Sequence, residues 1–400
     1  MYALQGIKIV DFGIFFAGPY AAKLLADLGA DVIKVEAVTG DPMRRSMGPF
    51  IGCQRNKRSL AVDLKNPDGQ AIVHKLFKQT DIVCHNMRPG VAERLGIGYE
   101  DVKKFNPGVI YMHSPSFGTI GPRKDQPGFE PLVGAMVGMA IMSAGKGNNP
   151  VNSVANMDYG NGQLGAIGLL MALIHRAKTG QGQKIECPQM VSGMITTSEL
   201  HWKKDGTLSE WFQLDQKQTG YGPLCRIYPT KSEEWICVVV AKEKDFQALC
   251  KTVGAPGLSS DLRFATKEAR KKNADSLSAE LEKLFLARTA AEWFKALDAA
   301  GVPCEISEMK GPDKLFGNPE HVQSGLVSVY PHSQFGTMRE VGQIIRLSET
   351  PGNIWGPAPL AGQHTRDILA ELGYTTSQQD DLKTRGIVNW PIEERAKVGV

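Results

Sequence analysis

The sequence predicts an α/β protein in which a large domain with a parallel sheet is accompanied by a smaller α+β domain. Three observations carry this prediction. Strand and helix patterns alternate through the first 200 residues, as in βαβ units. From His201 the chain becomes polar and aromatic and then shows an antiparallel pair of strands followed by helices. Short strands return after residue 315, so we expect boundaries near residues 200 and 315.

Length and composition describe a globular chain that can form one large or two ordinary domains. The 400 residues are 42% hydrophobic and 22% charged, with a net charge of +4. So small and dispersed a charge does not indicate a nucleic-acid or membrane partner. The seven cysteines form no Cys-x-x-Cys pair and have no histidine at zinc spacing, so we expect reduced thiols and no metal site. The N-terminus lacks the regions of a signal peptide, and we expect a cytoplasmic protein.

The chain opens with a βαβ unit. Residues 7–12 have the composition of a buried strand, and an amphipathic helix and a second strand ending at Glu36 follow. The loop at residues 13–19 supplies backbone N–H groups at a helix N-terminus, which is a general anion site. Residues 55–58 contain three basic side chains before the next strand. They fit either a phosphate site or a solvated basic turn.

The alternation then continues through the sheet domain. The expected elements are a helix at 66–79, a strand at 81–85, a helix carrying Glu93 and Arg94, and a strand at 109–113. A glycine-rich loop, residues 114–122, follows the last of these strands. Loops at the carboxyl ends of strands bind ligands in open α/β sheets. The apolar segment 131–142 predicts a buried helix.

The stretch at residues 154–183 carries the chemistry. Asp158 closes a short apolar segment, and a glycine-containing turn is expected to open an apolar helix that ends near Gly180. The unpaired N–H groups and the dipole at a helix start favour an ionised carboxylate, as a nucleophile requires. An ordinary N-cap aspartate is the alternative interpretation.

The same stretch also matches a dinucleotide-binding pattern. Gly160, Gly162 and Gly165 form G-x-G-x-x-G, and Glu186 follows about 20 residues later, where a ribose-binding acid would lie. A nicotinamide or flavin oxidoreductase is therefore an alternative, although Asp158 would repel a pyrophosphate at the first glycine. Glycines at this spacing would equally let a helix pack closely on a sheet.

The second half of the chain predicts the smaller domain and a return to the larger one. The expected elements are strands at 226–228 and 235–241, helices at 243–253, 265–285 and 289–300 with Thr289 as an N-cap, short strands within 320–350, and a helix at 365–372. G-x-S-x-G, Walker, H-E-x-x-H and kinase motifs are absent, so hydrolase, nucleotide and zinc interpretations lack support.

Several motifs in one order resemble the class III coenzyme A transferases, the CaiB/BaiF family of formyl-CoA:oxalate and carnitine CoA-transferases. The motifs are VDFGIFFAGPYAAKLLADLGADVIKVE, RNKRSLAVDLKNPDG, NMRPGVAERLGIGYEDVKKFNP, MDYGNGQLGAIGLLMALIHRAKTGQGQ, DLRFAT, RTAAEWFKAL and PAPLAGQHTRDILAELGY. They cover nearly the whole chain, and a series in order is more specific than one glycine pattern.

The resemblance implies an enzyme that moves CoA from an acyl-CoA donor to a free carboxylic acid, with no metal and no tightly bound cofactor. Asp158 matches the family's nucleophile, which forms a mixed anhydride and then an aspartyl-CoA thioester. Succinyl-CoA is the hypothesised donor. Glu130 matches a position that orients groups near the nucleophile. The CoA contacts that the resemblance implies are Phe16, Ala17, Asn56, Lys57, Asn86, Met87 and Arg94.

The charges of Lys57 and Arg94 would suit CoA phosphates. The resemblance further implies a Rossmann-like large domain built from both chain ends, residues 1–200 and 316–400, with the small α+β domain at 201–315 between them. It also implies an interlocked dimer, either of two identical chains or with a homologous second subunit.

The sequence departs from the family pattern at two places. Phe16 stands where oxalate-specific members have a glutamine, and the nearest equivalent of their four-glycine covering loop is Gly220–Gly222. Oxalate is therefore not the expected acceptor. The related 2-methylacyl-CoA racemases carry a Gly-His-Asp motif, and Gly128-Phe129-Glu130 lacks the histidine that a two-base racemase needs.

The acceptor is expected to be larger and less polar than oxalate, such as a branched or aryl-substituted dicarboxylate. Aromatic and apolar side chains that could bury its substituent are Phe15, Phe16, Met157, His201, Trp202, Trp211 and Tyr221. Arg88 or Lys203 could hold a second carboxylate. The alternative is that these aromatic residues only pack the domains together.

Overall fold

The computed structural model describes residues 1–152, 157–211, 213–231, 233–309 and 311–391. The chain divides into two compact units. The larger unit comprises Met1–Val137, Val154–Thr197 and Pro319–Val400, and the smaller unit comprises Gly138–Ser153 and Ser198–Asn318. The two units divide after residues 197 and 318, which is three residues from each of the boundaries expected at 200 and 315. The sequence did not indicate that residues 138–153 belong with the smaller unit.

A seven-stranded sheet forms the centre of the larger unit. Its strands are β1 (Lys8–Asp11), β2 (Asp31–Glu36), β3 (Lys57–Val62), β4 (Ile82–His85), β5 (Ile110–His113), β6 (Lys184–Glu186) and β13 (Val388–Asn389). Their order is β13-β3-β2-β1-β4-β5-β6, and all pairs are parallel except β13 with β3. The order 3-2-1-4-5-6 is that of doubly wound Rossmann folds, with its reversal between β1 and β4. The predicted fold class is confirmed.

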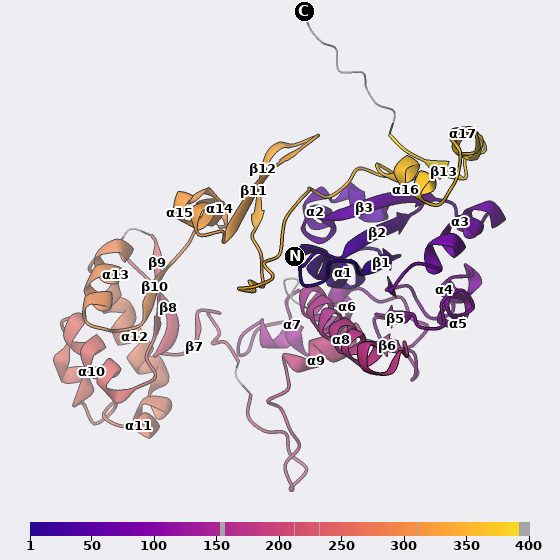
Figure 1. Cartoon of the computed structure of the whole chain (residues 1–400). Helices are drawn as coiled ribbons and strands as arrows, with labels where there is room; N and C mark the ends of the chain where they lie inside the picture. The colour runs from indigo at the N-terminus through magenta and orange to yellow at the C-terminus, as the bar shows by residue number, and fades with distance from the viewer. Residues whose placement is uncertain (153–156, 212, 232, 310, 392–400) are drawn as a thin grey trace, which may run out of the picture. The chain divides into compact units, whose positions relative to one another are not determined.

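Helices cover both faces of this sheet (Figure 1). On one face lie α1 (Ala17–Asp27), α2 (Met47–Gln54) and α8 (Met157–Thr179), and on the other lie α3 (Pro67–Phe77), α4 (Val91–Arg94), α5 (Tyr99–Lys103), α16 (Thr365–Glu371) and α17 (Thr376–Thr384). Further elements of this unit are the 3₁₀ helix η1 (Pro42–Arg45), α6 (Glu130–Met136), α9 (Gln189–Ile195), α15 (Pro319–Gln323) and the hairpin of β11 (Val327–His332) and β12 (Gly336–Val341).

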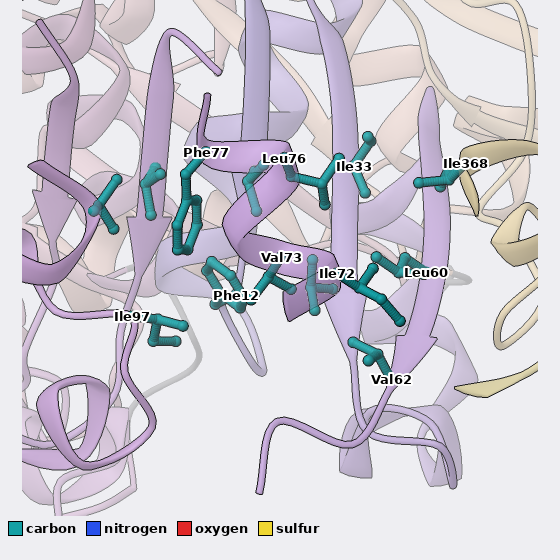
Figure 2. Close-up of a cluster of buried hydrophobic side chains, with 14 of the residues drawn as sticks. Phe12, Ile33, Leu60, Val62, Ile72, Val73, Leu76, Phe77, Ile97 and Ile368 are labelled. Carbon is teal, nitrogen blue, oxygen red and sulfur yellow. The ribbon is translucent and has the colours of Figure 1, made fainter. Parts of the chain in front are cut away.

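Alternation of side chains along the strands produces a separate core on each face. Val10 and Phe12 of the β1 segment pack under α3, whereas Ile9 packs against α1 and α8. Figure 2 shows the first of these cores, where Phe12, Val73 and Phe77 lie together. Because both faces are buried, short apolar runs such as Val32-Ile33 in β2, Leu60–Val62 in β3 and Ile82–Cys84 in β4 form the core positions of the strands.

The predicted buried helix at 131–142 is wrong in two respects. The segment forms α6 and the short α7 (Met139–Met142), separated at Gly138, whose φ of 87° lies in the left-handed region that favours glycine. Leu132 and Met136 of α6 are 52% and 45% exposed in the isolated chain. The apolar run therefore includes a surface as well as a core contact.

The smaller unit is an antiparallel sheet packed with helices. The strand order is β10-β9-β8-β7, with β7 (Gly220–Gly222), β8 (Cys225–Pro229), β9 (Trp235–Val239) and β10 (Cys304–Ser307). Its remaining helices are α10 (Glu243–Thr252), the 3₁₀ helix η2 (Pro256–Ser259), α11 (Lys267–Lys272), α12 (Ala274–Phe285), α13 (Ala290–Ala299) and α14 (Asp313–Gly317). Thr289 caps α13 in a capping box with Glu292, as predicted. The single helix predicted at 265–285 is divided at Asn273.

Candidate active site

The loops after β1, β4 and β5 meet at the carboxyl edge of the large sheet, beside the reversal of strand order between β1 and β4. Open α/β sheets bind ligands at this point. A cavity of about 370 Å³ lies there. Its lining consists of Ile14, Phe15, Phe16, Ala17, Asn86, Met87, Arg88, Pro89, Val91, Ser114, Ser116, Phe117, Lys124, Gln126, Pro127, Gly128, Phe129, Glu130, Asp158 and Gln189.

Asn86, in the loop after β4, is hydrogen-bonded to the loop after β1. Its Oδ1 accepts from Ile14 N at 2.8 Å, and its Nδ2 donates to Ile14 O at 2.6 Å. The next residue, Phe15, has a φ of 58°, which is costly for a residue with a β-carbon. Its ring meets that of Phe129 edge-on, with centroids 5.5 Å apart. The loop is therefore held in a strained conformation that brings Phe15 to the cavity wall.

Asp158 lies in the first turn of the long helix α8, which begins at Met157. The glycine-containing turn predicted at this point is wrong, because Gly160, Gly162 and Gly165 are all helical. Residues 153–156, on which the predicted segment before Asp158 partly falls, lie outside the described residues. The G-x-G-x-x-G pattern thus does not form the strand-to-helix turn that a dinucleotide needs.

These glycines let α8 lie close to its neighbours. A β-carbon at Gly162 would be 2.8 Å from Tyr20 Cβ, and one at Gly165 would be 2.9 Å from Met112 Sδ and 3.2 Å from Ala21 Cβ. The packing interpretation of the pattern therefore fits, with helix α1 as well as the sheet as the partner. Close packing fixes the start of α8, and with it Asp158, at the edge of the sheet.

Asp158 contacts two polar side chains at the base of the cavity. Gln189 Nε2 donates to Asp158 Oδ1 at 2.5 Å. Glu130, the first residue of α6, is hydrogen-bonded to the Asp158 carboxyl and accepts from Met157 N at 3.2 Å. Gly128 allows the chain before Glu130 to lie against the third loop, since a β-carbon there would be only 2.2 Å from Ser116 Cβ.

Burial and the carboxyl–carboxyl contact together determine the ionisation of Asp158. Burial, followed by the charge of Glu130 and the hydrogen bond with it, raises the pKa of Asp158 from 3.8 to about 7. Two carboxyls this close retain a proton between them near neutral pH, as in other acidic pairs. Asp158 is therefore a carboxyl that can act as a nucleophile when ionised and whose ionisation responds to its neighbours.

A stacked pair of histidines contacts the backbone of the loop after β4. The His85 and His113 rings lie 4.3 Å apart at 14°, at the carboxyl ends of β4 and β5. Met87 N donates to His85 Nδ1 at 3.2 Å, and His113 Nε2 lies 2.8 Å from Met87 O. Burial lowers the pKa of both imidazoles. Neutral rings therefore fix the backbone of Met87 at the cavity wall.

Six of the nine site residues predicted from the sequence line this cavity. They are Phe16, Ala17, Asn86, Met87, Glu130 and Asp158. Arg94 is exposed on α4 and does not line the cavity, although Val91 of the same helix does. Asn56 and Lys57 lie elsewhere, inside the protein. The first four of these follow β1 and β4, whose carboxyl ends share one edge of the sheet, and the starts of α6 and α8 place Glu130 and Asp158 at the same cavity.

The interpretation of residues 55–58 as a phosphate site or a solvated turn is not supported. Lys57 is fully buried, and its ammonium donates to Asp11 Oδ2 at 2.8 Å, Pro19 O at 2.8 Å and Gln54 Oε1 at 2.9 Å. These three bonds use all three of its N–H donors. Lys57 thus joins β3 to β1 and α1, with no donor left for a phosphate.

Asn56 and Arg55 instead hold the C-terminal part of the chain. Asn56 Oδ1 accepts from the backbone N–H groups of Trp355 and Gly356 at 2.8 and 3.1 Å, and its Nδ2 donates to Asn353 O at 2.7 Å. Arg55 pairs with Asp27 at 2.7 Å, and its Nη2 also donates to Gly342 O at 3.0 Å. Buried backbone that belongs to no sheet needs side chains as hydrogen-bond partners. Asn56 supplies these partners to the segment at residues 353–356, which explains a polar residue at this position.

Several lining residues were not predicted from the sequence, including Gln189, Lys124 and Phe117. Gln189 follows β6 in the chain, at the same carboxyl edge as the other loops, and this position was the available signal. Arg88, predicted as a partner for a second carboxylate, does line the cavity. Arg88 and Lys124 are its two basic residues, and both are exposed.

The remaining aromatic residues proposed for the acceptor belong to the smaller unit. They are His201, Trp202, Trp211 and Tyr221, and Lys203 lies in the same segment. Gly220–Gly222, the predicted counterpart of the covering loop, is strand β7 at the edge of the small sheet, paired with β8. Within the residues that the structure describes, no group of three or more His, Cys, Asp or Glu side chains could hold a metal ion.

A doubly wound sheet with a cavity and a buried carboxyl pair at its switch point has the arrangement of a ligand-binding site in an open α/β sheet. The model of CoA-transferase family III matches residues 4–365. The chain belongs to this family. It is an enzyme with CoA-transferase activity, and CoA is its co-substrate.

Characterised relatives span almost the whole chain. The succinyl-CoA–L-malate CoA-transferase beta subunit of Chloroflexus aurantiacus is 30% identical over 404 residues, covering 96% of this chain and 98% of that protein. The human succinyl-CoA:glutarate CoA-transferase is 31% identical over 405 residues, covering 96% and 90%. The succinyl-CoA–D-citramalate CoA-transferase of Chloroflexus aurantiacus is 31% identical over 392 residues, covering 95% and 96%.

Solved structures agree in fold. A CaiB/BaiF family protein from Brucella suis superimposes with a TM-score of 0.81 at 25% identity, covering 93% of this chain and 99% of that chain. Rv3272 from M. tuberculosis gives a TM-score of 0.80 at 26% identity, covering 92% and 99%. Among the described helices, none has the length and apolar character needed to cross a membrane.

Proposed function

We propose that this enzyme transfers CoA from succinyl-CoA to a dicarboxylic acid that bears an apolar substituent, with Asp158 as the nucleophile. The observation that carries the proposal is the buried Asp158 carboxyl at the base of the cavity, in contact with Glu130 and Gln189. A carboxylate suits this chemistry because an acyl anhydride and a thioester are close in energy to the substrates, so that each step is reversible.

The reaction divides into four displacements. An ionised Asp158 oxygen attacks the donor thioester carbon, the C–S bond breaks, and CoA thiolate leaves with the electron pair. The thiolate then attacks Asp158 Cγ, and the donor acid leaves as its carboxylate. The acceptor carboxylate attacks Cγ of the resulting aspartyl-CoA thioester and expels the thiolate. The thiolate finally attacks the acceptor carbonyl carbon, which gives the new acyl-CoA and restores Asp158.

Burial and Glu130 together set the protonation state of Asp158 from which this sequence begins. With a pKa of about 7, Asp158 is ionised in a substantial fraction of molecules at neutral pH and is a stronger nucleophile than an ordinary aspartate. We infer that Glu130 orients the Asp158 carboxyl through their hydrogen bond.

The relatives support succinyl-CoA as the donor. Three of them, which act with L-malate, D-citramalate and glutarate according to their names, share succinyl-CoA as the named CoA thioester. The CoA moiety would lie along the first two loops, against Phe16, Ala17, Asn86 and Met87. Arg94, exposed on α4, is the cation that we propose for its phosphates, with Lys57 excluded by burial.

The acceptor is inferred from the cavity wall. The edge-to-face pair of Phe15 and Phe129, together with Phe117, provides an apolar surface next to Asp158. Arg88 and Lys124 provide positive charge in the same cavity. A dicarboxylate could therefore present one carboxylate to the aspartyl thioester, pair the other with a cation, and bury a substituent against the rings. Burial at about 25 cal/mol per Å² makes a phenyl-sized group worth a few kcal/mol.

An acceptor series tests this specificity directly. With succinyl-CoA as donor, kcat/KM should be higher for phenyl- or benzyl-substituted succinates than for glutarate or malate, and lowest for oxalate. Phe15→Ala should reduce the advantage of the substituted acids by about tenfold or more, because most of the ring contact is lost. Arg88→Met should raise KM for dicarboxylates while leaving monocarboxylates unaffected. A preference for oxalate, or equal rates with and without the apolar group, would eliminate the acceptor assignment.

We further propose that the working enzyme is a two-chain assembly, formed by two copies or with a homologous subunit. Ile167, Met171 and Ile174 recur on one face of α8 and are 54%, 65% and 58% exposed in the single chain. Val191, Met194 and Ile195 of α9 are likewise about half exposed. So large an apolar face is typical of an interface. Among the relatives, succinyl-CoA–L-malate CoA-transferase has alpha and beta subunits. A stable monomer by mass measurement at micromolar concentration would contradict this assembly.

A further inference from the structure

Gln189 makes a short side-chain hydrogen bond to Asp158. It is the first residue of α9, it is buried, and its Nε2 donates to Asp158 Oδ1 at 2.5 Å. No sequence motif marks this position. The four displacements of the proposed reaction do not involve the Gln189 side chain. An amide donor aimed at one oxygen of a reacting carboxyl is an arrangement with a chemical consequence.

The fold holds Gln189 firmly in this position. Its backbone N–H donates to Pro115 O at 2.9 Å, which ties α9 to the loop after β5. Ser192 Oγ donates to Met157 O at 3.2 Å, so that α9 is also tied to the start of α8. A β-carbon at Gly193 would be 2.7 Å from Met157 Sδ. The donor is therefore positioned before the reaction begins, which is the condition under which it lowers a barrier.

Two of the four displacements occur at Asp158 Cγ and place negative charge on the carboxyl. When thiolate attacks the anhydride, or the acceptor attacks the aspartyl thioester, Cγ becomes tetrahedral. The electron pair of its C=O bond moves to the oxygen that does not bridge to the acyl group. That oxygen is the one already bound by Gln189 if the bridging oxygen is Asp158 Oδ2. A fixed N–H at an oxyanion stabilises the transition state more than the ground state.

We propose that Gln189 is a catalytic residue whose side-chain amide binds the oxyanion formed on Asp158 Oδ1 in the two displacements at Cγ. This inference rests on the proposed role of Asp158 as the nucleophile. The amide also directs the reaction, since it occupies Oδ1 and leaves Oδ2 as the attacking oxygen. No proton is transferred in this role, because the amide only donates a hydrogen bond.

The test compares Gln189→Leu with Thr196→Val, a change at the C-terminal end of the same helix that removes a hydrogen bond to Gly193 O. Gln189→Leu should lower kcat by about 10²- to 10³-fold with KM for succinyl-CoA changed little, as for the loss of an oxyanion donor. Thr196→Val should stay within about threefold of wild type. In a single turnover, covalent CoA on the peptide containing Asp158 should form more slowly in Gln189→Leu by the same factor as kcat.

A second readout separates this role from a purely structural one. Because the amide also stabilises the ionised carboxylate, its loss should move the acid limb of kcat/KM to higher pH by about one to two pH units. If the leucine variant does not fold, Gln189→Glu replaces it in the test, because Glu matches Gln in size. It should show the same loss of turnover. A folded Gln189 variant with wild-type kcat and an unmoved acid limb, alongside inactive Asp158→Asn, would overturn this inference and leave the proposed function intact. Turnover by Asp158→Asn would overturn both.

Discussion

Replacing Glu130 with Gln should move the acid limb of the pH–activity profile to lower pH. Burial, the charge of Glu130 and the hydrogen bond with it raise the pKa of Asp158 from 3.8 to about 7. Burial is the largest of these three causes, so Glu130 accounts for at most about two thirds of a rise of about three pH units. In Glu130→Gln we therefore expect the pKa of Asp158 to fall to between about 5 and 6.

The direction of the shift in the pH–activity profile follows from the charge of the nucleophile. Asp158 reacts when ionised, so activity is lost as pH falls through its pKa. At pH 6 about a tenth of the wild-type carboxyl is ionised, against half or more in Glu130→Gln. Relative to each enzyme's own plateau, kcat/KM at pH 6 should therefore be about five- to tenfold higher in the variant.

The assay is kcat/KM for succinyl-CoA measured from pH 4.5 to 9, normalised to the plateau because the loss of orientation by Glu130 lowers the absolute rate. Glu100→Gln removes an exposed carboxylate on α5 and should leave the profile unchanged. An acid limb that stays near pH 7 in Glu130→Gln, or that moves upward, would refute the carboxyl-pair account.

Three further predictions concern the framework around the site. Lys57→Met should destabilise the protein by about 3–5 kcal/mol in urea unfolding, because it leaves the Asp11 carboxylate buried without its ion pair; unaltered stability with weaker CoA binding would restore the phosphate role. Gly162→Ala should cost about 1–3 kcal/mol through overpacking of α8 on α1, whereas Gly52→Ala in α2, which meets only an atom 3.9 Å away, should be neutral or stabilising. Burial holds the pKa of His85 well below 6.5, so the free energy of unfolding should fall below about pH 6.5 by up to about 1.4 kcal/mol per pH unit. The slope should be shallower in His85→Phe, and an equal slope would contradict the assignment.

The fold was predictable from the sequence where local patterns determine the outcome. Apolar strands alternating with amphipathic helices allow few topologies, and the βαβ handedness rule selects a doubly wound sheet. The division of 131–142 was not predictable from hydrophobicity, because one glycine in a left-handed conformation ends α6. The edge strand β13 was missed because it has only two residues and depends on β3 for its pairing.

The site was predictable where a residue lies in a loop at a strand's carboxyl end, as Asn86 and Met87 do. It was not predictable where a charge is satisfied by distant residues. Lys57 resembles a ligand-binding lysine until its contact with Asp11, 46 positions away, is known. Gln189 was missed for the converse reason. Its importance comes from a contact with Asp158 across 31 positions, and a lone glutamine gives no local signal.

Covalent trapping at Asp158 tests the central claim most directly. The enzyme is incubated with succinyl-CoA, quenched with hydroxylamine and digested, and the peptide containing Asp158 is examined by mass spectrometry. The account predicts an aspartyl hydroxamate at Asp158 that depends on succinyl-CoA and is absent in Asp158→Asn, which should also lack turnover. A hydroxamate on another residue, or an Asp158→Asn enzyme with a tenth or more of the wild-type rate, would contradict the assignment of Asp158 as the nucleophile.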